Sequence, residues 1–224
     1  LLELYQPAIA KKTKHLPHGM MKLASGKMSS RTGDVISGED FLDKTQKAVM
    51  SRMGDELKLD SAEKKEEVAD KIAVASVKYS VLKGTTSRDI IYNEEEALSL
   101  AGNTGPYLLY TYARSQSLLE KAGTPGKDVA SLKYEPNEKE MAILRVLYRF
   151  PSVASEAASE FSPSTISTYV FDLAQRLNTF YSEVPVIKAE TEEIKEFRLF
   201  IVKRSAEVIK KSLELLGIPV VSRM

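Results

Sequence analysis

The chain has 224 residues, 43% hydrophobic and 28% charged, with a formal net charge of +1, a composition typical of a globular protein long enough to bury a core. The lack of cysteine excludes disulfides and thiolate metal sites, and no apolar run is long enough to span a membrane. Since no signal peptide opens the chain, we expect a cytoplasmic protein with no membrane partner.

The charges are unevenly distributed. Residues 1–34 carry six Lys or Arg against two acids, and residues 195–224 carry seven against three. The middle is acidic, with 14 acids and ten bases over 35–100 and 12 acids and nine bases over 101–194. Basic ends around an acidic middle fit a polyanion bound at separated places, but chance clustering on solvated faces explains them equally well.

Residues 1–12 are predicted to be the end of a helix, followed by a short extended segment over 16–23. Because Leu1 already belongs to an apolar helical pattern, we expect the chain to be a piece of a longer protein. His15 and His18 are the two histidines of the chain. A structural role beside the next loop is favoured for them over acid–base catalysis.

A small, flexible and basic loop follows over residues 24–34, with the sequence Ala-Ser-Gly-Lys-Met-Ser-Ser-Arg-Thr-Gly-Asp. Backbone N–H groups and hydroxyls of such a loop can surround an anion, with Lys27 and Arg31 as charges. The spacing does not fit a P-loop. From its residues alone the segment is a surface loop with a modest tendency to bind phosphate.

Two amphipathic helices are predicted next. The capping-box-like start at 37–40 opens a helix to about Met53, and a longer helix runs from about Ser61 to Leu82. A brief extended piece over 90–92 and a short helix over 94–100 follow. The apolar stripe of the longer helix steps by four, three, four and three residues through Val68, Ile72, Ala75, Tyr79 and Leu82.

The stretch 102–114 has the clearest local signals. Its helix is predicted to begin at Pro106, where a fixed φ suits the first turn, with Asn103 or Thr104 accepting free N–H groups and Gly123 as the stop. One face carries Tyr107, Tyr110 and Arg114. On pattern alone this face is either core with satisfied hydroxyls, the commoner case, or a surface that grips something planar and charged.

From about residue 104 onward a helix bundle with short connections is predicted. Asn137 is expected to cap a helix that Phe150-Pro151 breaks, and an alanine-rich helix then runs to about Phe161. Ser162 and Pro163 start the next helix, and the last helix covers Glu192 to Leu216. The inward stripe of the helix after Pro163 is predicted to be Ile166, Val170, Leu173, Leu177 and Phe180.

Several motifs together resemble one enzyme family. Gly26-Lys27-Met28-Ser29-Ser30-Arg31 resembles the signature loop of class I aminoacyl-tRNA synthetases, whose usual form is Lys-Met-Ser-Lys-Ser. The stretch 102–114 and the final run 215–224 resemble markers of arginyl-tRNA synthetases, and Tyr169–Tyr181 with Arg198-Leu199 resembles their helical anticodon-binding domain. The whole chain therefore resembles the C-terminal portion of a bacterial-type arginyl-tRNA synthetase.

The resemblance implies a mainly α fold in three parts. Residues 1–35 would be the tail end of a Rossmann-type catalytic domain, 36–101 a helical junction of the stem-contact type, and 102–224 a helical anticodon-binding bundle. The whole enzyme would join arginine to tRNA(Arg) through an arginyl-adenylate, using ATP with accompanying Mg²⁺ and no protein metal site, as a monomer. This piece lacks the second nucleotide motif and the arginine pocket, so we expect it to be inactive alone.

The resemblance also implies roles for single residues. Lys27 would steady the ATP phosphates during catalysis, and Met28 and Ser29 would position the nucleotide. Ser30 replaces the usual second lysine, a charge that Arg31 would supply only one position later. For tRNA, the residues that match the family's anticodon contacts are Tyr181 and the terminal Met224, with Tyr107, Tyr110 and Arg114 evenly balanced between core and tRNA contact.

A second interpretation stays open. The chain could be a stand-alone helical module that binds tRNA or protein and has kept a synthetase-like sequence without catalysis. The parent reading frame distinguishes the two, because a nucleotide-binding domain directly upstream of Leu1 supports the ligase.

We predict that Lys27→Ala in the full-length enzyme slows ATP–pyrophosphate exchange by about 100-fold or more, because losing one donor to a developing phosphate charge costs about 3 kcal/mol. Arg31→Ala, measured in parallel, slows exchange only if Arg31 replaces the missing lysine. Unchanged exchange in the Lys27 variant would remove its assigned role.

Overall fold

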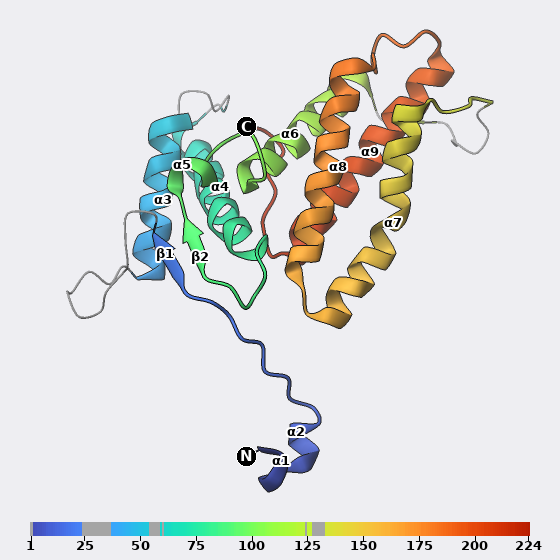
Figure 1. The fold of residues 1–224 in the computed structure, drawn as a ribbon. Coiled ribbons are helices and arrows are strands. Elements are labelled where there is room, and N and C mark those ends of the chain that lie inside the picture. Colours follow the sequence, from blue (N-terminus) through green and yellow to red (C-terminus); the bar gives the residue numbers. More distant parts are fainter. Residues whose placement is uncertain (1, 24–36, 54–58, 60, 124, 127–132) are drawn as a thin grey trace.

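The structure is a computed structural model that describes residues 2–23, 37–53, 59, 61–123, 125–126 and 133–224. Within these ranges the chain is mainly helical, as predicted. Figure 1 shows a helical bundle beside a smaller group of helices and two short strands, with the N-terminal segment reaching away from both. The loop predicted over 24–34, with Lys27, Met28, Ser29 and Arg31, lies outside the described residues.

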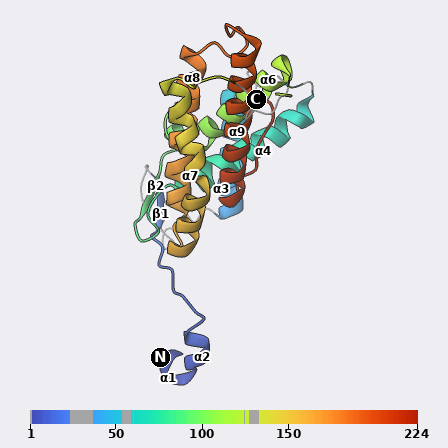
Figure 2. The same ribbon diagram turned by 90° about the vertical axis from the view of Figure 1, so that its right-hand side faces the viewer.

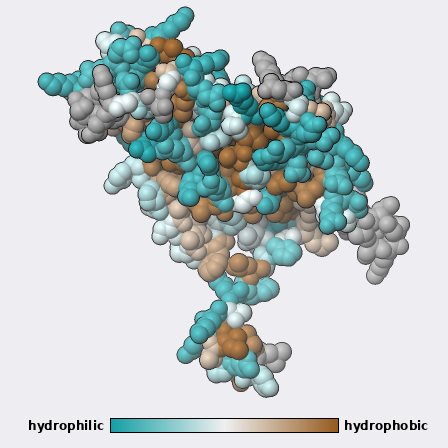
Figure 3. Space-filling model, turned by 180° about the vertical axis from the view of Figure 1, so that it is seen from behind, coloured by the Kyte–Doolittle hydropathy of each residue, from teal (hydrophilic) through white to brown (hydrophobic). Residues whose placement is uncertain are grey.

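The N-terminal segment is a pair of single-turn helices, α1 (Leu2–Tyr5) and α2 (Pro7–Ala10), where the sequence predicted one helix end. Its apolar side chains face solvent, with Leu4 88% and Tyr5 85% exposed. Figure 3 shows this apolar surface on the projecting segment, below a larger apolar area on the rear face of the body. The segment therefore contributes nothing to the core of the described chain.

Two short strands pair in parallel. β1 (Met21–Leu23) lies beside β2 (Ile90–Tyr92), with Met21 opposite Ile90. Both extended pieces were predicted, but their pairing joins segments almost 70 residues apart and carries no local signal. Gly19 runs so close to Arg88 that a Cβ would lie 2.1 Å from its carbonyl oxygen, which explains the glycine.

The smaller helical group comprises α3 (Gly38–Met53), α4 (Ala62–Leu82) and α5 (Glu94–Ala97). Helix α4 packs against α3 on one side and the bundle on the other. Its predicted stripe is buried at Ile72, Ala75 and Tyr79 and half-buried at its two ends. The helical period alone therefore identified the core face of this helix.

Helix α6 (Gly105–Ala122) lies directly against α4. A Cβ on Gly105 would meet the Ala75 carbonyl oxygen at 2.3 Å, so only glycine allows this contact. Of the two predicted capping residues, Thr104 accepts the Tyr107 N–H at 3.2 Å, and Asn103 instead reaches Tyr79. The first turn of α6 is thereby fixed to α4.

The Tyr79 hydroxyl joins three elements at this contact. It lies 2.6 Å from Asn103 Oδ1, before α6, and 3.0 Å from the Ser167 carbonyl oxygen in α8. The side chain is fully buried, and burial raises the pKa of its phenol above the usual range. The neutral hydroxyl thus holds α4, α6 and α8 together at every physiological pH.

The bundle is completed by α7 (Glu138–Glu160), α8 (Pro163–Glu183) and α9 (Glu192–Leu215). Helix α8 packs against α7 and α9, and α9 also packs against α6. Figure 2 shows α7 and α8 running along the length of the bundle beside α9. The inward stripe predicted for α8 is buried at all five positions: Ile166, Val170, Leu173, Leu177 and Phe180.

Two boundaries were predicted wrongly. The short helix predicted over 94–100 ends at Ala97. Helix α7 continues through Pro151 instead of breaking there. Proline removes one main-chain hydrogen bond and kinks a helix, but it does not end one whose far half is held by packing. Val153 and Ala157, beyond the proline, are buried in the same core as Val146 before it. The helix ends at Phe161, which adopts a left-handed conformation with φ 56°.

A buried ion pair joins α7 to α9. Arg198 Nε donates to Glu140 Oε1 at 2.8 Å, and both side chains are buried. The other carboxylate oxygen accepts from the Tyr134 hydroxyl at 2.8 Å and the Asn137 N–H at 2.9 Å, which completes the capping box of α7. A second guanidinium nitrogen donates to the Pro185 carbonyl at 2.8 Å.

The ionic state of this pair follows from its partners. Burial alone would lower the pKa of Arg198, but the hydrogen bond to Glu140 and the charges of Glu140 and Glu190 more than compensate, and the pKa is raised. The guanidinium therefore stays charged, and its interior position depends on the carboxylate opposite.

We predict that Glu140→Gln lowers the free energy of unfolding by about 3 kcal/mol, because it leaves a buried guanidinium without its main counter-charge. Glu183→Gln is the matched control, since Glu183 pairs with Lys139 on the surface. The control should cost less than about 1 kcal/mol. If urea denaturation shows the same loss of unfolding free energy for both variants, the buried pair stabilises the fold no more than the surface pair does.

Candidate nucleic-acid interface

Helices α6 and α8 bring together residues that the sequence had only placed on separate helices. Arg114 of α6 lies over the ring of Tyr181 of α8, with its guanidinium carbon 4.0 Å from the ring centre. We call the surface formed by Tyr107, Tyr110, Arg114, Asn178 and Tyr181 the α6–α8 face. The contact is a cation–π interaction, which orients the guanidinium without neutralising it.

Tyr107 is held by a hydrogen-bond network. Its hydroxyl accepts from Asn178 Nδ2 at 2.9 Å, and the same nitrogen donates to Thr111 Oγ1 at 2.9 Å. Its ring packs edge-on against Phe171, with centroids 5.7 Å apart. Tyr107 is thus half-buried, and one side of it is held by structural contacts. For this residue the structure favours the interpretation as core.

Tyr110 belongs to the exposed part of the face. Its side chain is 40% exposed, and within the described part of the chain no hydrogen bond or ring contact fixes it. Tyr107, Tyr110 and Arg114 follow each other at helical spacing, so the ring stands between a fixed tyrosine and a positioned arginine. In the predicted face, Tyr107 is therefore held in place by hydrogen bonds, whereas the ring of Tyr110 is not.

Asn178 is a residue that the sequence analysis missed. It shares a stripe of α8 with Phe171 and Tyr181, seven residues after the first and three before the second. The sequence signal that could have identified Asn178 is a polar residue on a stripe of half-buried aromatic residues. Its amide fixes α6 to α8 and holds the registry that places Arg114 over Tyr181.

Met224 lies at the end of a tail that packs on the bundle. The tail is fixed where Lys78 Nζ donates to the Gly217 carbonyl at 2.5 Å and where Arg223 pairs with Glu120 of α6 at 3.0 Å. Met224 itself is half-buried against the core, and the C-terminus lies beside α6 (Figure 1). The structure thus places it near α6, packed on the same core as Tyr181.

The chemistry of the α6–α8 face is that of recognition. Arg114 makes no ion pair with any described carboxylate, so its charge is available to an anion. An aromatic ring beside an unpaired guanidinium suits an unstacked base and its phosphate. Among the described residues there is no cluster of three or more metal-ligating side chains, and no helix long and apolar enough to cross a membrane.

Two family models match the sequence. Residues 2–93 match the catalytic domain of class I tRNA synthetases of the arginine type, and residues 108–224, about half of the chain, match the DALR anticodon binding domain. The α6–α8 face lies almost wholly within the second match.

Curated relatives agree with both matches. The arginine–tRNA ligase of Flavobacterium psychrophilum is 37% identical over 212 residues, which are 94% of this chain and 35% of the relative. That of Fusobacterium nucleatum is 35% identical over 213 residues, which are 94% of this chain and 37% of the relative. The chain thus spans about a third of the length of the curated relatives it matches.

Solved structures show the same fold. The arginyl-tRNA synthetase of Thermus thermophilus superposes with a TM-score of 0.88 at 30% identity, over 100% of this chain and 38% of that one. The enzyme of Plasmodium falciparum gives a TM-score of 0.67 at 19% identity, over 83% of this chain and 32% of that one, a likeness of fold alone.

Proposed function

The chain belongs to the arginyl-tRNA synthetase family, and on that premise we propose that it is the part of an arginine–tRNA ligase that carries the signature loop and reads the anticodon. The α6–α8 face is the observation that supports this assignment. It presents a tyrosine ring and an unpaired guanidinium 4.0 Å apart, inside the segment that matches an anticodon-binding family.

In this proposal the anticodon loop of tRNA(Arg) opens against the bundle. An unpaired base stacks on the exposed ring of Tyr110 or on Tyr181, and in the second case Arg114 leaves the Tyr181 ring and turns toward the adjacent phosphate. Stacking of a base on an aromatic side chain contributes about 1–3 kcal/mol. Because Tyr107 is fixed by Asn178, its role is to set the position of the face, and it contacts RNA only with its exposed edge.

The catalytic part of the proposal depends on residues outside the described ranges. ATP and arginine would react in the full-length enzyme, where the arginine carboxylate attacks the α-phosphate, pyrophosphate leaves and arginyl-adenylate forms. Lys27 would stabilise the phosphate charge, with Met28 and Ser29 positioning the nucleotide and Mg²⁺ accompanying it. The match to the catalytic domain of the family over residues 2–93 supports this role of the loop.

The structure also bears on the stand-alone module. A two-stranded sheet is marginally stable by itself, and the N-terminal segment exposes Leu4 and Tyr5 almost completely. Further sheet and helices from a catalytic domain would cover both features. These observations favour the ligase over a free-standing module.

We predict that Tyr181→Ala in the full-length protein weakens tRNA(Arg) binding by about tenfold, because one stacking platform is lost. Tyr181→Phe keeps the ring and should bind tRNA(Arg) almost normally. Filter binding or fluorescence anisotropy measures the affinity, and urea denaturation should show only a small loss of stability for the alanine variant. Normal affinity together with a large loss of stability would assign Tyr181 to the core.

A further inference from the structure

A second basic and aromatic surface lies on α7, on the other flank of α8 from α6. It surrounds a shallow hollow of about 500 Å³. We call it the α7 outer face; its lining residues are Met141, Leu144, Arg145, Tyr148 and Arg149. All five come from two and a half turns of one helix, so their arrangement is set by the helix itself.

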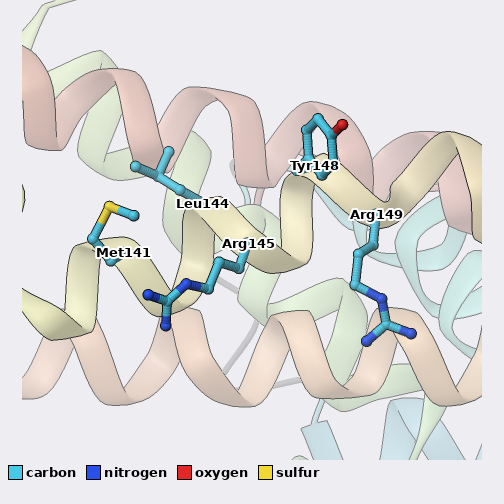
Figure 4. Close-up of a pocket in the computed structure, with 5 residues that line it drawn as sticks. All are labelled: Met141, Leu144, Arg145, Tyr148 and Arg149. Atoms are coloured by element: carbon cyan, nitrogen blue, oxygen red, sulfur yellow. The ribbon is translucent and has the colours of Figure 1, made fainter.

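The side chains of this face have a definite arrangement. In Figure 4, Arg145 and Arg149 extend from the same side of α7, one turn apart, whereas Leu144 and Tyr148 project from the other side. The two guanidinium groups thus form one edge of the hollow, and an aromatic ring with an aliphatic side chain forms the opposite edge. Charge and apolar surface are therefore separated across it.

The two arginines are not used by the fold. The α7–α8 hairpin carries four cations, and two of them are paired with carboxylates: Lys139 with Glu183, and Arg176 with Asp172. Arg145 and Arg149 form no ion pair with any residue that the structure describes, and both are exposed. The unpaired positive charge of the hairpin is thus concentrated at the hollow.

Tyr148 is also unused by the fold. Its side chain is 88% exposed, although it lies on a helix whose Ile143 and Val146 are buried. An exposed tyrosine across the hollow from two unpaired arginines offers a stacking surface with both cations on the opposite edge. No acidic side chain lines the hollow, so an anionic ligand meets no repulsion there.

We propose that the α7 outer face is a second RNA contact, at which Arg145 and Arg149 bind backbone phosphates and Tyr148 stacks on an exposed base. Guanidinium groups bind phosphate oxygens with two parallel hydrogen bonds, and a tyrosine ring accepts any base. The contact is independent of base identity, in contrast to the α6–α8 face. The proposal rests on the proposed function only in that the RNA is the same tRNA.

The test compares three variants of the full-length protein. The first is the double variant Arg145→Gln and Arg149→Gln, and the second is Tyr148→Ala. The control is the double variant Lys210→Gln and Lys211→Gln. The control removes two cations from α9, each of which lies near Glu214. The affinities for tRNA(Arg) and for a tRNA with an unrelated anticodon are measured between 50 and 200 mM salt, a range over which phosphate contacts are resolved.

The proposal predicts that the arginine variant lowers the slope of log affinity against log salt by about 1–2, since each phosphate contact contributes roughly 0.7–0.9. Both tRNAs should lose affinity to a similar degree, about tenfold. Tyr148→Ala should weaken both by about five- to tenfold with no change of slope. The control should change neither quantity measurably, and melting temperatures should stay unchanged because all the altered side chains are exposed.

The outcomes separate this proposal from the anticodon assignment. Unchanged affinity and slope in the arginine variant, with weakened binding in Tyr181→Ala, overturns the α7 contact and leaves the anticodon face in place. The reverse pattern overturns the anticodon assignment and supports the α7 contact. An equal loss of affinity in the control variant shows general electrostatic attraction and overturns the α7 contact. A wild-type protein that binds neither tRNA overturns the α7 contact as well.

Discussion

The buried pair of Glu140 and Arg198 is the constraint on which one end of the bundle, the end that carries Tyr181, depends. It joins the first turn of α7 to α9 and, through the Pro185 carbonyl, to the segment that follows α8. Next to Glu140, Lys139 pairs with Glu183 in the last turn of α8, two residues after Tyr181. Because a buried charge cannot tolerate loss of its partner, the pair fixes this end of the bundle, where α8 carries Tyr181.

A second constraint connects this bundle to the segment that precedes it. Gly105 lets α6 touch the backbone of α4, and the Tyr79 hydroxyl bonds to groups on either side of the contact. The α6–α8 face and the smaller helical group therefore share one packed core. A ligand that shifts α6 would displace α4 with it, since packed cores change between discrete arrangements and do not deform continuously.

Local sequence signals predicted the helices and strands but not the contacts between them. The stripes of α4 and α8 and the start of α6 follow from periodicity, proline and capping residues, all of which act within one turn or two. The continuation of α7 through Pro151 was missed, because the packing of Val153 and Ala157 that holds it comes from other helices. Arg114 over Tyr181, and Asn178 between α6 and α8, join residues 67 and 71 positions apart, a separation that single-helix patterns do not encode.

The central claim, that the α6–α8 face receives the anticodon loop, is tested most directly by hydroxyl-radical footprinting of tRNA(Arg) bound to the full-length protein. The account predicts that sugars of the anticodon loop become protected, since single-stranded loops recognised by stacking lie against the protein. An anticodon loop that stays as reactive as in free tRNA, while other regions of the same molecule are protected, would contradict it.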